Sequence, residues 1–100
     1  MTIPSGKSGY YFVYALARFA ANANGVRTMQ LTQGSGQSSI AVMEQTPGGV
    51  SSNTALYAAT IRYAAAGDYF ETKIYQTSGG SLDVLSGDNQ NYMGIQYVGA

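Results

Sequence analysis

The sequence contains no cysteine, no histidine and no tryptophan. Without cysteine the chain can form no disulfide, and the usual thiol nucleophile of covalent catalysis is excluded. Without histidine it lacks the side chain most often used as a general base and as a metal ligand. We therefore expect a protein that is not an enzyme, holds no cofactor and has no dedicated metal site.

Charge is also scarce, since charged residues make up 10% of the chain and five basic side chains balance five acidic ones. Nucleic-acid binding draws most of its affinity from a basic surface, so we expect no nucleic-acid partner. The sequence has no apolar run of the roughly 20 residues that a membrane-spanning helix requires, which predicts no membrane insertion.

The length of 100 residues suits one domain, which we place at 1–100. A domain of this size buries only about 60% of the surface of its unfolded chain. Disulfides and structural metals are the common reinforcements of small domains, and this composition supplies neither. Association of subunits is the remaining common way to stabilise such a fold.

Apolar residues recur with a period of two, which indicates strands. The pattern predicts about seven of them, joined by turns rich in glycine and asparagine. The predicted strands span residues 9–20, 26–33, 38–45, 54–65, 69–77, 82–85 and 92–98. This arrangement is typical of an all-β sandwich or jelly roll with no helix.

The first of these strands is apolar on both faces. One face carries Tyr11, Val13, Ala15, Ala17 and Phe19, and the other carries Tyr10, Phe12, Tyr14, Leu16 and Arg18. A strand with one face in water shows polar residues on that face. The pattern therefore predicts that a second surface covers the other side of this strand.

The order and spacing of four sequence segments are informative when they are taken together. Ile3-Pro4-Ser5 precedes the strand GYYFVYALARF at 9–19, the turn and strand AGDYFE follow at 66–71, and YMGIQYV lies at 92–98. Together they resemble the jelly-roll family of tumour necrosis factor, which includes the globular head of the complement first component. The likeness is greatest to the short bacterial and phage versions of that family.

The resemblance implies an antiparallel jelly-roll sandwich that forms a homotrimer about its inner sheet. Met93, Ile95 and Tyr97 of the last strand would then face the core. The implied trimer-interface residues are Tyr10, Phe12, Tyr14, Leu16, Tyr92, Gln96 and Val98. Related heads open with one or two strands before the Ile-Pro segment, so the fold is expected to lack the opening strands. Another chain supplies them, the sequence is a piece of a longer one, or the fold is a reduced version.

By the same resemblance we expect a non-enzymatic trimeric virion or surface protein of phage type, made in the host cytoplasm. It would be the head of a tail or neck fibre that attaches to a receptor, or a decoration subunit of a capsid. Its partners would be other virion proteins or a host cell-surface glycan. The alternative is a soluble carbohydrate- or protein-binding module of the complement-head type. Any ligand would meet the loops at 22–25, 46–52 and 86–91, through residues such as Asn22, Asn24, Asp88 and Asn89.

The sequence offers three chemical alternatives. Asp83, Asp88 and Asn89 could offer oxygen ligands to calcium, but their spacing matches no known loop, and turn formation explains them. Asp68 and Glu71 could form a glycosidase pair, but they alternate along a strand. The rings of Tyr57, Tyr69 or Tyr75, which we expect to be the most exposed tyrosines, could stack on a sugar.

Overall fold

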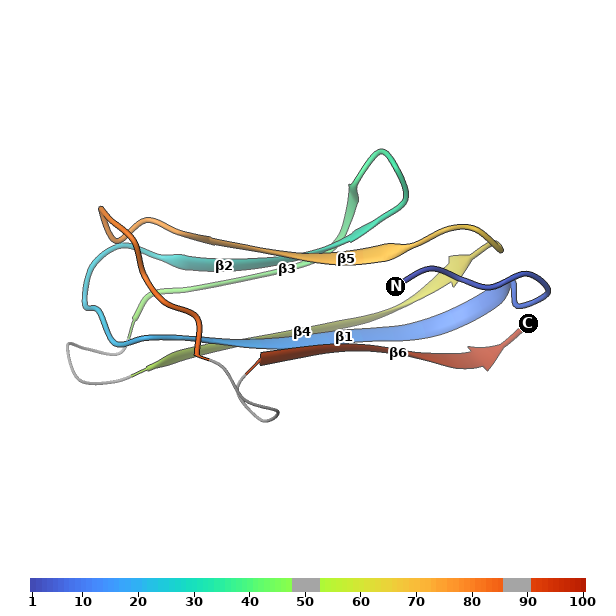
Figure 1. Cartoon of the computed structure of the whole chain (residues 1–100). Coiled ribbons are helices and arrows are strands. Elements are labelled where there is room, and N and C mark those ends of the chain that lie inside the picture. The colour runs from blue at the N-terminus through green and yellow to red at the C-terminus, as the bar shows by residue number, and fades with distance from the viewer. Residues whose placement is uncertain (48–52, 86–90) are drawn as a thin grey trace.

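The computed structural model describes residues 1–47, 53–85 and 91–100 and shows two β-sheets facing each other (Figure 1). The strands are β1 (Gly9–Phe19), β2 (Arg27–Gln33), β3 (Ser38–Gln45), β4 (Thr54–Ala64), β5 (Phe70–Gln76) and β6 (Asn91–Gly99). No helix occurs in the described part of the chain. The predicted all-β sandwich is therefore confirmed at the level of two stacked antiparallel sheets.

Each sheet has three strands, in the orders β4-β1-β6 and β3-β2-β5. All neighbouring strands are antiparallel. β1 and β4 pair along their full lengths, from Gly9 opposite Ala64 to Phe19 opposite Thr54. β6 pairs with the other edge of β1, with one shift of register between Tyr10 and Tyr11. β1 is thus the central strand of its sheet, as its apolar composition suggests.

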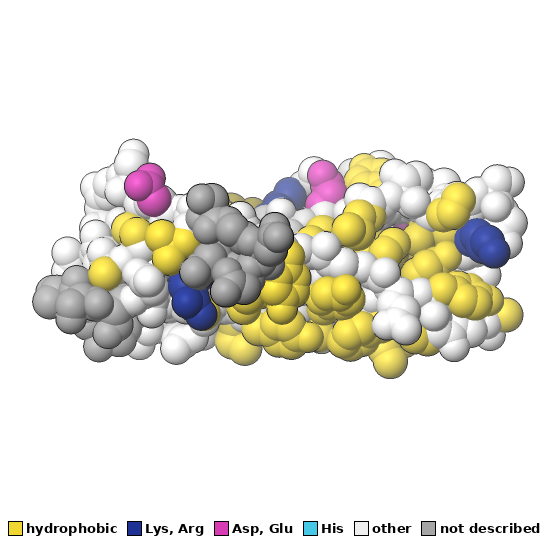
Figure 2. All heavy atoms as spheres, turned by 60° about the horizontal axis from the view of Figure 1, so that its bottom comes forward, with side chains coloured by type: hydrophobic (Ala, Val, Ile, Leu, Met, Phe, Trp, Pro, Cys, Tyr) yellow, Lys and Arg dark blue, Asp and Glu magenta, His cyan; other side chains and the backbone are white. Residues whose placement is uncertain are grey.

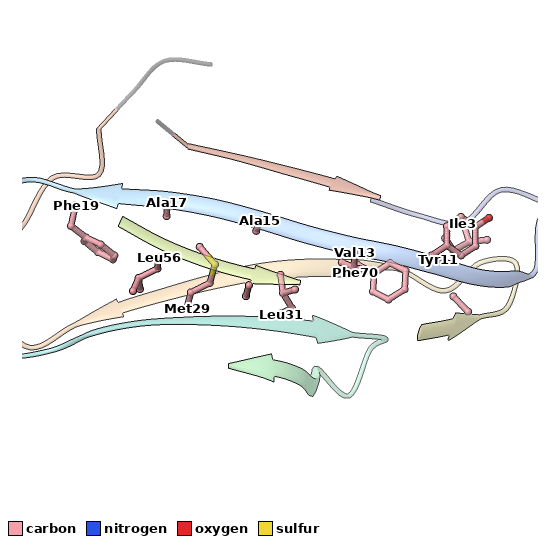
Figure 3. Packing of buried hydrophobic residues seen from close by; sticks show 12 residues of the cluster. Ile3, Tyr11, Val13, Ala15, Ala17, Phe19, Met29, Leu31, Leu56 and Phe70 are labelled. Carbon is pink, nitrogen blue, oxygen red and sulfur yellow. The ribbon is translucent and has the colours of Figure 1, made fainter. Parts of the chain in front are cut away.

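The core lies between the two sheets (Figure 3). Tyr11, Val13, Ala15, Ala17 and Phe19 are buried there, so the face of β1 opposite the predicted trimer-interface residues is the one that points into the sandwich. The other buried apolar residues are Ile3, Met29, Leu31, Leu56, Ala58, Ala64 and Phe70. Burial of these side chains contributes roughly 1.5–3 kcal/mol for each of the larger ones and dominates the stability of the sandwich.

Two details of the predicted fold are wrong. The segment 82–85 is not a strand; it forms one isolated bridge, between Val84 and Phe19. Tyr97 was assigned to the core and is 48% exposed, although its ring contacts that of Tyr11 at 5.4 Å between centroids. It is exposed because β6 is an edge strand, so only one neighbouring strand covers it.

The two sides of the sandwich differ. β3 and β4 are in contact along one side. β5 and β6 are the edge strands of the opposite side, where the N-terminal residues pair with the start of β5 through a bridge between Thr2 and Tyr69.

Candidate interaction surface

The face of the β4-β1-β6 sheet that points away from the core is covered mainly by apolar side chains (Figure 2). Because residues alternate between the two sides of a strand, this face receives every second residue. Its side chains are Tyr10, Phe12, Tyr14, Leu16 and Arg18 from β1, Ala55, Tyr57, Ala59, Ile61 and Tyr63 from β4, and Tyr92, Gln96 and Val98 from β6. We call this set the outer face; Arg18 is its one charged member.

Six large apolar side chains of the outer face are 41–58% exposed in the single chain. They are Tyr10, Tyr57, Ile61, Tyr63, Tyr92 and Val98. Phe12, Tyr14 and Leu16 lie between them and are partly buried by their neighbours. Such a concentration differs from the single scattered apolar residues of ordinary protein surfaces.

Aromatic contacts fix the side chains of the outer face relative to one another. The rings of Tyr10 and Tyr63 meet edge to face at 5.4 Å, and those of Phe12 and Tyr14 stack at 5.4 Å. Tyr14 also meets Tyr92 at 6.2 Å. Arrangements of this kind stabilise aromatic pairs by about 0.5–1.5 kcal/mol beyond simple burial. The outer face is therefore an ordered surface that spans all three strands.

Gly94 makes room for the ring of Tyr14. The two residues are directly opposite in the β1–β6 register, and a Cβ atom at Gly94 would overlap the end of the Tyr14 ring. A glycine inside a strand often marks such a close approach. Gly94 thus lets the Tyr14 ring lie flat across β6.

All seven residues predicted for the trimer interface lie on the outer face of one sheet. Burial of these seven residues by sister subunits stays a prediction. Tyr57, Ile61 and Tyr63 of β4 belong to the same face and were not predicted for it. The sequence contains a signal for this, because β4, like β1, carries apolar residues on both of its faces.

A hollow of about 330 Å³ adjoins the outer face at the edge of β4. It lies between the edges of β3 and β4 and is lined by Ala41, Val42, Met43, Tyr57, Ala58 and Ala59. None of these residues is charged or has a polar side chain other than the hydroxyl of Tyr57. Since Tyr57 and Ala59 belong to both features, the apolar surface is continuous from the outer face into the hollow.

Of the predicted ligand-loop residues, the structure describes Asn22 and Asn24, whereas Asp88 and Asn89 lie outside the described residues. Asn22 Oδ1 accepts a hydrogen bond from the backbone N–H of Asn24 at 2.9 Å, which closes a local turn. The guanidinium of Arg27 donates to the carbonyl oxygens of both residues, at 2.9 and 2.8 Å. This loop is therefore tied to the body of the domain.

The described residues contain no group of three or more acidic side chains placed to hold a metal ion. Asp68 accepts hydrogen bonds from the side chain of Gln33 at 2.8 Å and from the N–H of Tyr69 at 3.0 Å, so its carboxylate supports the turn before β5. Within the same ranges, no helix is long and apolar enough to cross a membrane.

Comparison with models of known protein families finds no match, and comparison with curated proteins finds none either. The likeness to the tumour-necrosis-factor-like jelly roll accordingly rests on the sequence segments quoted above.

Proposed function

We propose that this domain is a non-enzymatic structural subunit that assembles into a homotrimer through its outer face. In this proposal the sandwich is a jelly roll of the tumour-necrosis-factor-like type. The trimer is a virion or surface component of phage type, serving as a fibre head that attaches to a receptor or as a capsid decoration. The observation that carries the proposal is the ordered, nearly uncharged apolar surface of one sheet.

The size of that surface supports association. Six side chains that are about half exposed, at roughly 100 Å² each, leave on the order of 600 Å² of accessible surface. The partly buried members between them add to this area. A standard interface buries about 800 Å² on each partner, and the largest patch of a typical monomer is about 300–600 Å². The outer face is therefore at the upper end of the range for the largest patch of a monomer, and its partly buried members bring it nearer to the area of a standard interface.

The hollow beside β4 supports a cyclic arrangement. In a ring of three subunits each interface joins two different surfaces, so every subunit needs two complementary patches. The outer face supplies a projecting aromatic surface, and the adjoining hollow supplies a concave apolar one. In the proposed trimer, each outer face packs against the β3–β4 side of the next subunit.

A structural role also suits the chemistry of the chain. Histidine and cysteine are absent from the sequence, and its acidic and basic residues number five each. The carboxylate of Asp68 is engaged in turn formation, as described above. What the domain offers a partner is apolar area and tyrosine hydroxyls, which suit assembly better than catalysis.

Light scattering on outer-face variants tests the proposal. Tyr14→Asp and Tyr92→Lys each bury an unpaired charge in every apolar contact between subunits, so each should convert the trimer into monomer or aggregate. Thr28→Lys, on the opposite sheet, should leave the trimer intact. Circular dichroism establishes whether each variant keeps its strands. A wild-type protein that stays monomeric at high concentration contradicts the proposal.

The second candidate, a carbohydrate-binding module, is favoured by the exposed rings of Tyr10, Tyr57 and Tyr63 on one face of the sheet. This candidate would be supported if the wild-type protein bound to a glycan array and the Tyr57→Ala variant did not, while both had the same oligomeric state. A trimer that binds no glycan would favour the decoration role.

A further inference from the structure

The rings of Tyr14 and Tyr92 meet across two neighbouring strands of the outer face. Their centroids are 6.2 Å apart, and the ring planes are inclined at 71°. Tyr14 lies opposite Gly94 in the β1–β6 register, and Tyr92 lies two residues before Gly94 on the same side of β6. The two tyrosines are therefore diagonal neighbours that only the folded sheet brings together.

The hydroxyl end of the Tyr14 ring is the part that reaches β6. A Cβ atom at Gly94 would overlap Cζ, the hydroxyl oxygen and Cε2 of Tyr14. Cε2 is a ring carbon next to the one that carries the hydroxyl group, and carbons at this position form the new bond when two tyrosyl radicals couple. Gly94 thus lets the reactive edge of one phenol lie over β6, in contact with the ring of Tyr92.

The composition of the chain directs one-electron oxidation to tyrosine. Cysteine, the side chain that is oxidised most readily in many proteins, is absent, and so is tryptophan, whereas there are nine tyrosines. Tyr92 is 41% exposed, and Tyr14 is partly buried beside it. A small oxidant in the solvent therefore reaches this pair of rings through Tyr92.

We propose that Tyr14 and Tyr92 form a site of oxidative cross-linking, at which a one-electron oxidant joins their rings as dityrosine within one chain. Each phenol loses one electron and its hydroxyl proton and becomes a tyrosyl radical. The two radicals form a carbon–carbon bond between ring carbons next to the hydroxyls, and the hydrogens of these carbons move to the oxygens and restore both hydroxyl groups. The chain loses two hydrogen atoms, whose electrons go to two equivalents of the oxidant and whose protons go to the solvent.

Strand register distinguishes this pair from the other two tyrosine contacts. The pairs Tyr10–Tyr63 and Tyr11–Tyr97 join residues that are directly opposite each other. Cβ atoms of directly opposite residues are about 4.5–5.5 Å apart, whereas those of diagonal neighbours are roughly 7 Å apart. The bond of dityrosine joins ring carbons that are distant from both Cβ atoms, so the wider diagonal spacing suits it better.

The link would tie β1 covalently to the edge strand β6 in a chain that has no cysteine. A cross-link that closes a long loop restricts the unfolded chain and so favours the folded one. Assembly is not required, because both tyrosines and the intervening glycine belong to the same chain. The proposed trimer and the proposed cross-link can therefore fail independently.

The test exposes the protein to a ruthenium tris-bipyridine complex, persulfate and light, and identifies linked peptides by mass spectrometry. Unlabelled and isotope-labelled chains are mixed in denaturant and refolded together beforehand, so that a link within one chain differs in mass from a link between two chains. The expected main product is a peptide pair joined at Tyr14 and Tyr92, lighter than its parts by two hydrogen atoms, with both halves carrying the same label.

Three variants locate the link. Tyr14→Phe and Tyr92→Phe keep a ring but lack the hydroxyl, so each should abolish the product. Tyr75→Phe, on the other sheet, should leave its yield unchanged. Gly94→Val should lower the yield, because the displaced ring of Tyr14 no longer lies over β6.

The proposal is overturned if the wild-type protein gives no peptide pair joined at Tyr14 and Tyr92, or if Tyr14→Phe leaves the product in place. It is also overturned if the two halves carry different labels. That last result would show a bond between sister subunits, which would support the proposed trimer while removing the site within one chain.

Discussion

Arg27 holds the loop between β1 and β2 against the end of the sandwich. Its side chain is 0% exposed, and its guanidinium donates to the carbonyl oxygens of Asn22, Asn24 and Val26 at 2.9, 2.8 and 3.3 Å. The guanidinium carbon also lies 5.9 Å from the centre of the Phe19 ring. A buried cation is costly unless hydrogen bonds replace its hydration. Backbone carbonyls do so here for both terminal nitrogens of Arg27, whereas its Nε is buried without a partner among the described residues.

We therefore expect Arg27→Met to lower the free energy of unfolding by about 2–4 kcal/mol, since it leaves loop carbonyls unpaired in the interior. Denaturant unfolding followed by circular dichroism measures the change. Arg62→Met is the matched control, because Arg62 is exposed, and it should change stability by less than about 0.5 kcal/mol. Equal stability of the two variants would show that the carbonyl contacts of Arg27 contribute little.

At the scale of the elements, β6 shapes the outer face at Gly94, where the absence of a side chain leaves room for a neighbouring ring. Gly94 lies beneath the ring of Tyr14, and Tyr92 contacts that ring from the side. A side chain at Gly94 would meet only the far end of a flexible residue, so the backbone pairing of β1 and β6 can persist while the ring moves.

Gly94→Val is accordingly expected to separate folding from assembly. Valine suits a strand, so the free energy of unfolding of the monomer should change by less than about 1.5 kcal/mol, the scale of one aromatic contact. The NMR signals of the displaced Tyr14 ring should shift. The assembly should be weaker than in the wild type, so that on dilution it dissociates at a higher protein concentration. Gly80→Ala should change neither, because a Cβ there meets nothing. Unchanged assembly in Gly94→Val would show that the Tyr14 ring is not part of the contact.

At the scale of the whole molecule, the proposed assembly is apolar in character. The outer face contains one charged residue, Arg18, and the hollow beside it contains none. We expect the trimer to resist an increase of sodium chloride from roughly 0.1 M to 1 M, which screens charge pairs, and to be strengthened by sulfate. Sedimentation equilibrium at the two salt concentrations measures this. Dissociation at high salt would indicate that charge pairs hold the subunits together.

Features that depend on local alternation are predicted from the sequence, whereas those that depend on strand pairing are not. The strand at 38–45 has its predicted bounds, and the alternate residues from Tyr11 to Phe19 share one face of β1 as predicted. Both follow from a local period of two, which does not determine which face of β1 is buried. The outer-face role of Tyr57, Ile61 and Tyr63 was not predicted, because which strand lies beside β1 depends on pairing between distant segments. The strand expected at 82–85 failed for the same reason, since only Val84 finds a partner.

The sequence by itself determined that the chain forms strands, that its central strand is apolar on both sides, and that histidine and cysteine chemistry is excluded, because these are properties of composition and local alternation. The tertiary structure alone decided which apolar side is buried, which strands are edges, and that Arg27 is enclosed by loop carbonyls. It also decided that Thr2 pairs with Tyr69, directly before β5. These features arise from contacts between residues far apart in the chain, whose formation depends on the packing of the whole sandwich.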